Sequence, residues 1–238
     1  MAFMKKKIAA RTILCDIDST ITDLKPGRFG GDFREGVFQM LSRHIARRMN
    51  IAEPAARELL DTFANNLHIW WDYPDFIAHF ALDAKTVWQE MRGLHNDALL
   101  VHADAVAMVK SLQEYGKDLY VVSNNPITGC LLKLERAGLA DLRGSPYFKR
   151  IFGTNVTKGM KNQPMLWRWI LISLGVDPGD VLTIGDSVKE DCEAPAKAGI
   201  GQAIIVDRNL DRDILATDGH VRVKSLAYVK DLIDQKKR

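Results

Sequence analysis

The spacing of apolar residues divides the chain into three regions. A mostly apolar run at residues 12–17 predicts a buried strand. Between about residues 24 and 100 the apolar positions recur three and four apart, which predicts helices, and convincing strand patterns are absent. The expected helices of this region cover residues 33–49, 54–63, 75–80 and 84–91.

Beyond residue 101, helical and extended patterns alternate. The expected strands cover residues 119–122, 151–152, 181–184, 203–206 and 221–223. The expected helices cover residues 104–115, 126–137, 164–174, 191–198 and 226–233. Gly116, Gly138 and Gly175 stand where three of these helices would end. This alternation is typical of a parallel sheet with helices on both faces.

The three regions predict an α/β protein built from two domains. Residues 1–23 and 101–238 would form a doubly wound parallel sheet, a Rossmann-like core. Residues 24–100 would form an all-helical cap domain, inserted after the first strand. Gly27, Gly30 and Gly31 lie near one junction, where they suit either a hinge or an ordinary surface loop.

Composition excludes several classes of function. The chain has 238 residues, of which 47% are hydrophobic, so a sizeable core is available. A net charge of +3 is too small to indicate nucleic-acid binding, and the clearest basic runs, at residues 5–7 and 236–238, are expected to be solvated tails. No apolar segment approaches the roughly 20 residues that a membrane span requires.

Cysteine usage and the N-terminal pattern favour a cytoplasmic location. Cys15, Cys130 and Cys192 are odd in number and widely spaced, which suits reduced thiols better than a disulfide framework. The lysines before the first apolar stretch imitate a signal peptide, but Arg11 interrupts that stretch. Cleavage there would also remove the first predicted strand. We therefore expect a soluble, intracellular protein.

The first predicted strand ends at two carboxylates, Asp16 and Asp18, followed by Ser19 and Thr20. Asp16 and Asp18 share one face if the strand continues, because neighbouring side chains alternate. Two anions held so close repel each other unless a cation compensates them. A bound Mg²⁺ ion, which prefers oxygen ligands, would do so, although a strand end with an ordinary Asp/Ser/Thr turn explains the pattern too.

Three further groups of polar residues follow predicted strands or begin helices. Ser123, Asn124 and Asn125 follow the strand at residues 119–122, Lys161 precedes the helix at residues 164–174, and Asp186 and Asp191 follow the strand at residues 181–184. Each group has an ordinary explanation alone: helix capping, a solvated lysine, or a turn. Ligands bind at the carboxyl ends of parallel strands. Because all of these polar groups are expected at that one edge of the sheet, together they indicate a binding site.

In order along the chain, these motifs resemble those of phosphatases of the haloacid dehalogenase superfamily, in particular the phosphoglycolate phosphatase-like subfamily with an inserted helical cap. Residues 16–20 match the first motif, Asp-x-Asp-x-Thr/Val, and Ser123 matches the second. Lys161 matches the third, with Lys158 as a weaker candidate. Residues 185–191 match the fourth, Gly-Asp-x-x-x-x-Asp. The resemblance covers residues 12–206, but no substrate-defining motif is present in the cap.

The resemblance implies a mechanism with an aspartyl-phosphate intermediate. Asp16 would attack phosphorus, while Asp18 would protonate the leaving group and later deprotonate water. Asp16, the backbone carbonyl of Asp18 and Asp186 would hold Mg²⁺, and Asp191 would orient the metal's water shell or Lys161. Phosphoryl oxygens would bind Ser123 and Lys161, with the Asn124 backbone amide helping. The carboxylate at position 18 favours phosphoryl transfer over carbon–halogen cleavage, because a halide needs no proton.

The cap is expected to close over a small phosphorylated metabolite. Arg28 and Arg34 could reach an anionic leaving group, although exposed charges on a helix are the ordinary explanation for them. Trp70 or Trp71 could line the cleft, although packing in the cap core is the ordinary explanation for these rings. Phosphoglycolate, a sugar phosphate, a nucleotide or pyrophosphate all fit. A phosphomutase, a pyrophosphatase and a non-catalytic phospho-acceptor module remain alternatives, whereas the missing Gly-x-Gly-x-x-Gly turn argues against a dinucleotide-binding dehydrogenase. The sequence does not indicate an oligomeric state.

Overall fold

The structure is a computed structural model that describes residues 7–68, 70–141 and 143–234. Its main sheet has seven strands in the order β5-β4-β1-β6-β7-β9-β8. The strands are β1 (Thr12–Cys15), β4 (Asp118–Val122), β5 (Phe148–Phe152), β6 (Val181–Gly185), β7 (Ala203–Val206), β8 (Ile214–Ala216) and β9 (Val221–Val223). All neighbouring pairs are parallel except β8 and β9. The chain thus winds outward from β1 in both directions, which confirms the predicted doubly wound sheet.

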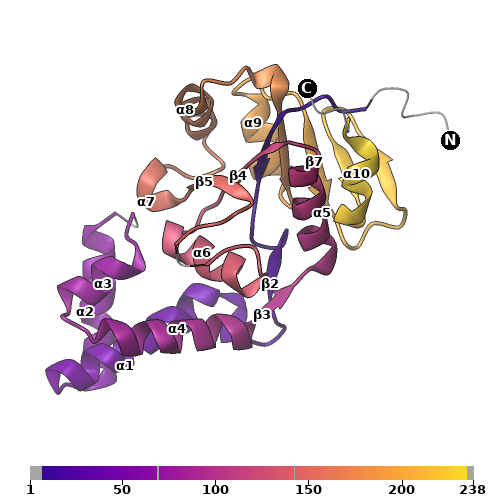
Figure 1. The fold of residues 1–238 in the computed structure, drawn as a ribbon. Coiled ribbons are helices and arrows are strands. Elements are labelled where there is room, and N and C mark those ends of the chain that lie inside the picture. Colours follow the sequence, from indigo (N-terminus) through magenta and orange to yellow (C-terminus); the bar gives the residue numbers. More distant parts are fainter. Residues whose placement is uncertain (1–6, 69, 142, 235–238) are drawn as a thin grey trace.

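Helices cover both faces of this sheet (Figure 1). Ile13 and Cys15 of β1 pack against helices on one face, whereas Leu14, between them, packs against the other face. The first face holds α5 (Ala103–Glu114), α6 (Ile127–Arg136) and α10 (Val229–Leu232). The second face holds α8 (Pro164–Leu174) and α9 (Ala194–Ala196). This two-sided burial explains why the central strands are apolar runs in the sequence.

Four helices follow one another within residues 33–98 and make up the segment that we call the cap: α1 (Phe33–Met49), α2 (Glu53–Asn66), α3 (Tyr73–His79) and α4 (Ala84–Ala98). They bury a hydrophobic cluster that includes Phe38, Leu41 and Phe76, and Leu132 of α6 packs into it. Hydrogen bonds and an ion pair between Arg92 of α4 and Glu135 of α6 join this cap to the core. Asp72 accepts hydrogen bonds from Thr128 Oγ1 at 2.9 Å and from Asn155 Nδ2 at 3.1 Å. These bonds tie the cap to α6 and to α7 (Thr154–Thr157), beside the carboxyl edge of the sheet.

The structure differs from the sequence-based expectation at the two cap junctions. β2 (Thr22–Leu24) pairs antiparallel with β3 (Leu99–Val101), so a two-stranded ribbon connects the cap to the core. Each strand has three residues, too few for an alternation of apolar and polar positions to stand out. Strand β8 is equally short and was not expected. The predicted helix at 191–198 begins as a π-helical turn at Lys189–Glu193.

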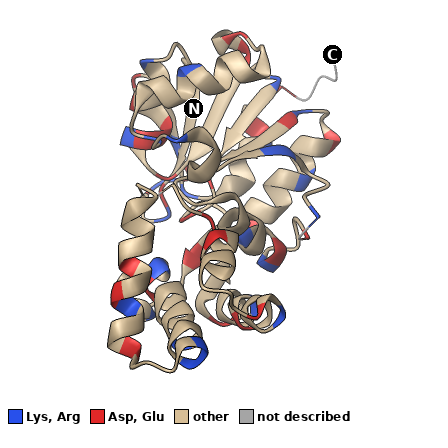
Figure 2. Cartoon of the chain, turned by 90° about the vertical axis from the view of Figure 1, so that its left-hand side faces the viewer, with Lys and Arg blue, Asp and Glu red and all other residues tan. Residues whose placement is uncertain are grey.

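Charged residues are spread over both domains. Lys and Arg are interspersed with Asp and Glu on the core and on the cap (Figure 2), in keeping with the small net charge of +3. The basic runs at residues 5–7 and 236–238 lie outside the described residues, except for Lys7. Within the part of the chain that the structure describes, no helix is both long enough and apolar enough to cross a bilayer.

Candidate active site

Three carboxylates converge at the carboxyl edge of the sheet. Asp16 follows β1 directly, and its backbone N–H bonds to the Ile184 carbonyl of β6 at 2.9 Å. This bond fixes Asp16 beside the turn that follows β6, where Asp186 and Asp191 lie. One carboxylate oxygen of each of Asp16, Asp186 and Asp191 lies within 4.8 Å of the others. The sequence predicted Asp16 and Asp186 as metal ligands and Asp191 as a supporting residue, and the structure brings all three together.

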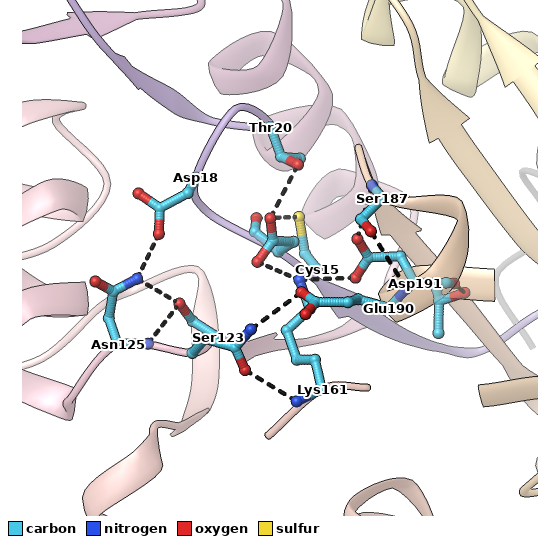
Figure 3. Close-up of polar contacts among 12 residues, drawn as sticks. Cys15, Asp18, Thr20, Ser123, Asn125, Lys161, Ser187, Glu190 and Asp191 are labelled. Carbon is cyan, nitrogen blue, oxygen red and sulfur yellow. Dashed lines mark hydrogen bonds and ion pairs between the residues drawn. The ribbon is translucent and has the colours of Figure 1, made fainter. Parts of the chain in front are cut away.

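Lys161 places a positive charge inside this cluster. Its Nζ lies 2.7 Å from Asp16 Oδ1 and 2.9 Å from Asp191 Oδ1, and the side chain is only 3% exposed. Thr20 Oγ1 donates to the other oxygen of Asp16 at 3.2 Å. Figure 3 shows Lys161 and Asp191 facing the end of β1. The alternative lysine, Lys158, is exposed, and its Nζ donates to the Trp70 carbonyl at 3.3 Å instead.

One ammonium group cannot balance three carboxylates at this site. Burial raises the pKa of Asp16 to about 8, with Asp191 adding to the effect and Lys161 opposing it. Burial and the charge of Asp191 likewise raise the pKa of Asp186 to about 6. The cluster therefore has excess negative charge, supplied by hard oxygen donors, which is the donor set that Mg²⁺ prefers. Asp16, Asp186 and Asp191 fit a divalent cation.

The turn after β6 requires a glycine to bring Asp191 to this position. A Cβ atom on Gly185 would overlap the Asp191 carboxyl group. The same carboxyl group accepts the Ser187 backbone N–H at 3.1 Å, and Thr183 Oγ1 donates to the Asp191 backbone carbonyl at 2.5 Å. The Gly-Asp-x-x-x-x-Asp pattern of the sequence is thus a turn that folds Asp191 back over β6.

Asp18 lies on the other side of Asp16 and faces a different set of partners. The chain turns sharply after it, with Ser19 at a φ of 54°, and continues into β2. Its two carboxylate oxygens contact Lys133 Nζ and Asn125 Nδ2, yet its side chain is 49% exposed. Burial disfavours the Asp18 carboxylate, but Lys133 and Asn125 outweigh burial and lower its pKa. Asp18 is therefore held as a carboxylate at the open side of the site.

Ser123, Asn124 and Asn125 line the edge beyond β4. Ser123 is buried, and its Oγ accepts hydrogen bonds from the Asn125 backbone N–H at 3.2 Å and from Asn125 Nδ2 at 2.9 Å. Asn124 Oδ1 accepts the Lys161 backbone N–H at 2.9 Å, and its Nδ2 donates to Glu190 at 3.0 Å. The Asn124 side chain thus connects three motif-bearing segments.

A cleft of about 390 Å³ opens between the core and the cap on the Asp18 side. Its walls include Asp18, Asn125 and Lys133 from the core and Phe33, Arg34 and Trp71 from the cap. A cavity of this size holds a small molecule. Asp18 thus lies between the cleft and the buried carboxylate cluster.

The structure separates the four predicted cap contacts into two pairs. Arg34 and Trp71 line the cleft, and the Arg34 guanidinium lies over the rings of Phe38 and Trp71, at 4.7 and 5.8 Å. Arg28 pairs with Asp97 and does not line this cleft. Trp70 does not line it either. Trp71 combines both roles considered from sequence, because it also packs in the cap core.

Sequence reasoning missed Lys133, Asn125 as a side-chain ligand of Asp18, and Asp72 as the cap-to-core link. Lys133 lies within the apolar stretch of α6 and belongs to none of the four sequence motifs. A lysine on the buried face of an amphipathic helix was the available signal, because such a charge requires a partner. The partner itself, 115 positions away, could not be read from sequence.

The chain belongs to the haloacid dehalogenase-like hydrolases, since the model of that family matches residues 10–199. It is 29% identical over 130 residues to enolase-phosphatase E1 of Pseudomonas fluorescens (strain Pf0-1), covering 55% of this chain and 53% of that protein. It is 32% identical over 122 residues to enolase-phosphatase E1 of Marinobacter nauticus (strain ATCC 700491 / DSM 11845 / VT8), covering 50% of each. The chain thus spans about half the length of the curated relatives it matches.

Among solved structures, the chain is similar to a HAD phosphatase from Thermococcus onnurineus. The TM-score is 0.62 at 23% identity, covering 96% of this chain and 100% of that one. At this level of identity the likeness confirms the fold. The α/β prediction and the superfamily resemblance are therefore confirmed, whereas the phosphoglycolate phosphatase-like subfamily stays a prediction.

Proposed function

We propose that this chain is a Mg²⁺-dependent phosphatase that hydrolyses a small phosphate monoester through an aspartyl-phosphate on Asp16. The observation that supports this most is the division of labour between two carboxylates. Asp16 is 5% exposed inside a cluster that suits a cation, whereas Asp18 is half exposed beside a small-molecule cleft. A nucleophile and a proton-transferring group require these two different environments.

In the first half-reaction, an oxygen of Asp16 bonds to phosphorus as the bond to the leaving oxygen breaks. The bonding electron pair goes to the leaving oxygen, which takes a proton from Asp18. Asp18 is a carboxylate in the free protein, so it must first take up this proton from solvent, when the anionic phosphate binds beside it and raises its pKa. In the second half-reaction, water attacks phosphorus, gives a proton to Asp18, and inorganic phosphate leaves Asp16. Lys161 would hold a phosphoryl oxygen together with Ser123 and the Asn124 backbone amide. Mg²⁺ at Asp16, Asp186 and Asp191, with the Asp18 backbone carbonyl as a further donor, would offset the negative charges.

The carboxylate of Asp18 at the cleft favours phosphoryl transfer over other reactions of this hydrolase family. A carbon–halogen bond releases a halide, which takes no proton, so the cleft-facing Asp18 would have no task there. The enolase-phosphatase relatives are phosphatases by name, and this supports the same reaction class. The similarity spans only about half of their length, so it does not indicate that this chain acts on the same substrate. The cleft suits a small phosphorylated metabolite, with Arg34 and Trp71 contacting its leaving group.

Release of inorganic phosphate from p-nitrophenyl phosphate tests the proposal. The wild type should turn over repeatedly with Mg²⁺ and lose activity in EDTA, and Asp16→Asn should lower kcat by at least about 10⁴-fold, because the nucleophile is lost. Release of a single equivalent of p-nitrophenol, with the phosphoryl group retained on the protein, would indicate a phospho-acceptor module instead. A panel of phosphorylated metabolites and pyrophosphate, with hexose phosphates checked for isomerised product, then separates a monoesterase from a pyrophosphatase or a mutase.

A further inference from the structure

Lys133 is a buried ammonium group that the mechanism above does not use. It lies on α6, its side chain is 3% exposed, and it reaches the site from a helix that otherwise buries apolar residues. A buried charge without a partner costs several kcal/mol, so its partners indicate why it is there. Those partners are the Asp18 carboxylate and Asn125 Oδ1, the latter at 3.1 Å.

The contacts around Lys133 form a closed network on the leaving-group side of the site. Asn125 accepts from Lys133 and donates to Asp18, while its Nδ2 also lies 2.9 Å from Ser123 Oγ. Lys133 Nζ lies 5.5 Å from the centroid of the Phe33 ring, which belongs to the cap. Both oxygens of Asp18 are thereby fixed, and the exposed part of its side chain borders the cleft.

We propose that Lys133 is the positioning residue for Asp18: it holds the carboxyl group toward the leaving oxygen. This inference rests on the proposed function. The proton can pass from Asp18 to the leaving oxygen only while the carboxyl group keeps this position. Lys133 therefore matters most when the leaving group needs a proton. Lys161 performs the corresponding task for Asp16 on the buried side of the site.

Two substrates of similar shape separate this role from a general structural one. Phenyl phosphate releases a basic phenolate that needs protonation, whereas 2,4-dinitrophenyl phosphate releases a stable phenolate that does not. The measured quantity is kcat/KM, because it reports the steps up to formation of the aspartyl-phosphate. Lys133→Met should lower kcat/KM for phenyl phosphate by about 10²-fold and that for 2,4-dinitrophenyl phosphate by about threefold or less.

A double-mutant cycle tests whether Lys133 acts through Asp18. In an Asp18→Asn background, Lys133→Met should change kcat/KM for phenyl phosphate by only about twofold, since the group that it positions is gone. Arg136→Met, on an exposed position of the same helix, should leave both substrates unaffected. Methionine is apolar and of similar volume, so the variant should fold, and its melting temperature checks this.

Equal losses on the two substrates would overturn the inference, as would a loss that persists in the Asp18→Asn background. The proposed function is read separately in the same assay, from the turnover of 2,4-dinitrophenyl phosphate by the wild type and its loss in Asp16→Asn. Turnover that depends on Asp16 with a uniform Lys133→Met effect would leave the phosphatase standing and remove Lys133 from its mechanism. No turnover of either substrate would overturn both.

Discussion

Asp16 and Asp18, two positions apart, lie in opposite surroundings. Asp16 is buried with Asp186, Asp191 and Lys161, all of them from the core. Asp18 is half exposed, and the cleft that it borders is built from the core and the cap together. Each carboxylate has its own buried ammonium group, Lys161 or Lys133. A lysine–aspartate ion pair thus lies in a buried cluster on one side of the site and beside an open cleft on the other.

The comparison indicates how such a chain can change substrate and keep its chemistry. The Asp16 side consists of residues that follow strands or lie in tight turns, so the sheet itself fixes their positions. The Asp18 side depends on α6, on the turn after β1 and on cap residues such as Arg34. We expect substitutions on the Asp16 side to affect every substrate alike. Substitutions on the Asp18 side should affect substrates according to their leaving groups.

Among variants that keep both carboxylates, removal of the ammonium group on the Asp16 side should have the largest effect. Lys161→Met leaves Asp16 and Asp191 without their shared ammonium group, and a phosphoryl oxygen would keep only Ser123 and the Asn124 backbone amide as partners. We expect kcat to fall by about 10³-fold for all phosphate esters. Lys158→Met is the matched control and should stay within about twofold, because that side chain points to the Trp70 carbonyl. A comparable loss in Lys158→Met would mean that Lys158, and not Lys161 alone, holds a phosphoryl oxygen.

A second substitution tests the turn that positions Asp191. Gly185→Ala places a methyl group where the Asp191 carboxyl group lies, so Asp191 must move. We expect a 10- to 100-fold weaker apparent Mg²⁺ affinity, measured as the Mg²⁺ dependence of phosphate release. Gly201→Ala is the control, since a Cβ atom there meets nothing within 4 Å. Unchanged Mg²⁺ dependence in Gly185→Ala would exclude Asp191 from the cation site.

The sequence predicted the Asp16 side of the site well. Asp16, Lys161, Asp186 and Asp191 are each close to a strand end or a helix start, so a reading of the elements already placed them at one edge. Their mutual distances follow from the strand order, with β1 beside β4 and β6. Local patterns were sufficient because the sheet is regular.

The Asp18 side could not be predicted in the same way. Lys133 and Asp18 are 115 positions apart, and their contact depends on how α6 packs against the sheet. The roles of Arg28 and Arg34 looked alike in sequence, but only Arg34 lines the cleft, because Arg28 is drawn to Asp97 at the end of α4. Side-chain pairing between distant segments, rather than periodicity, fixes this half of the site.

Arg34 offers a smaller effect that should depend on the substrate. Among the residues that the structure describes, its guanidinium lies over two rings and forms no ion pair, so it is available to an anionic leaving group. Arg34→Gln should raise KM about 3- to 10-fold for a phosphate ester that bears a carboxylate, with little change for p-nitrophenyl phosphate. Arg28→Gln should change neither KM. An equal effect of the two variants would remove the distinction between the two arginines.

The pH dependence of Mg²⁺ binding tests the Asp16 side with the smallest effect. Without a cation, Asp16 and Asp186 keep protons up to about pH 8 and about pH 6 in the folded protein, whereas both lose them near pH 4 when it is unfolded. The folded state then binds more protons than the unfolded state, so stability falls as pH rises from about 4 to about 8. Mg²⁺ removes this penalty by replacing the protons.

The melting temperature should therefore rise with Mg²⁺ by a few degrees at pH 8, at roughly 2–4 °C per kcal/mol, and by less at pH 5. Asp186→Asn, measured by the same thermal scans, should reduce the gain at pH 8. An equal gain at both pH values would contradict a cation site made of these carboxylates, because protons and Mg²⁺ would then not compete.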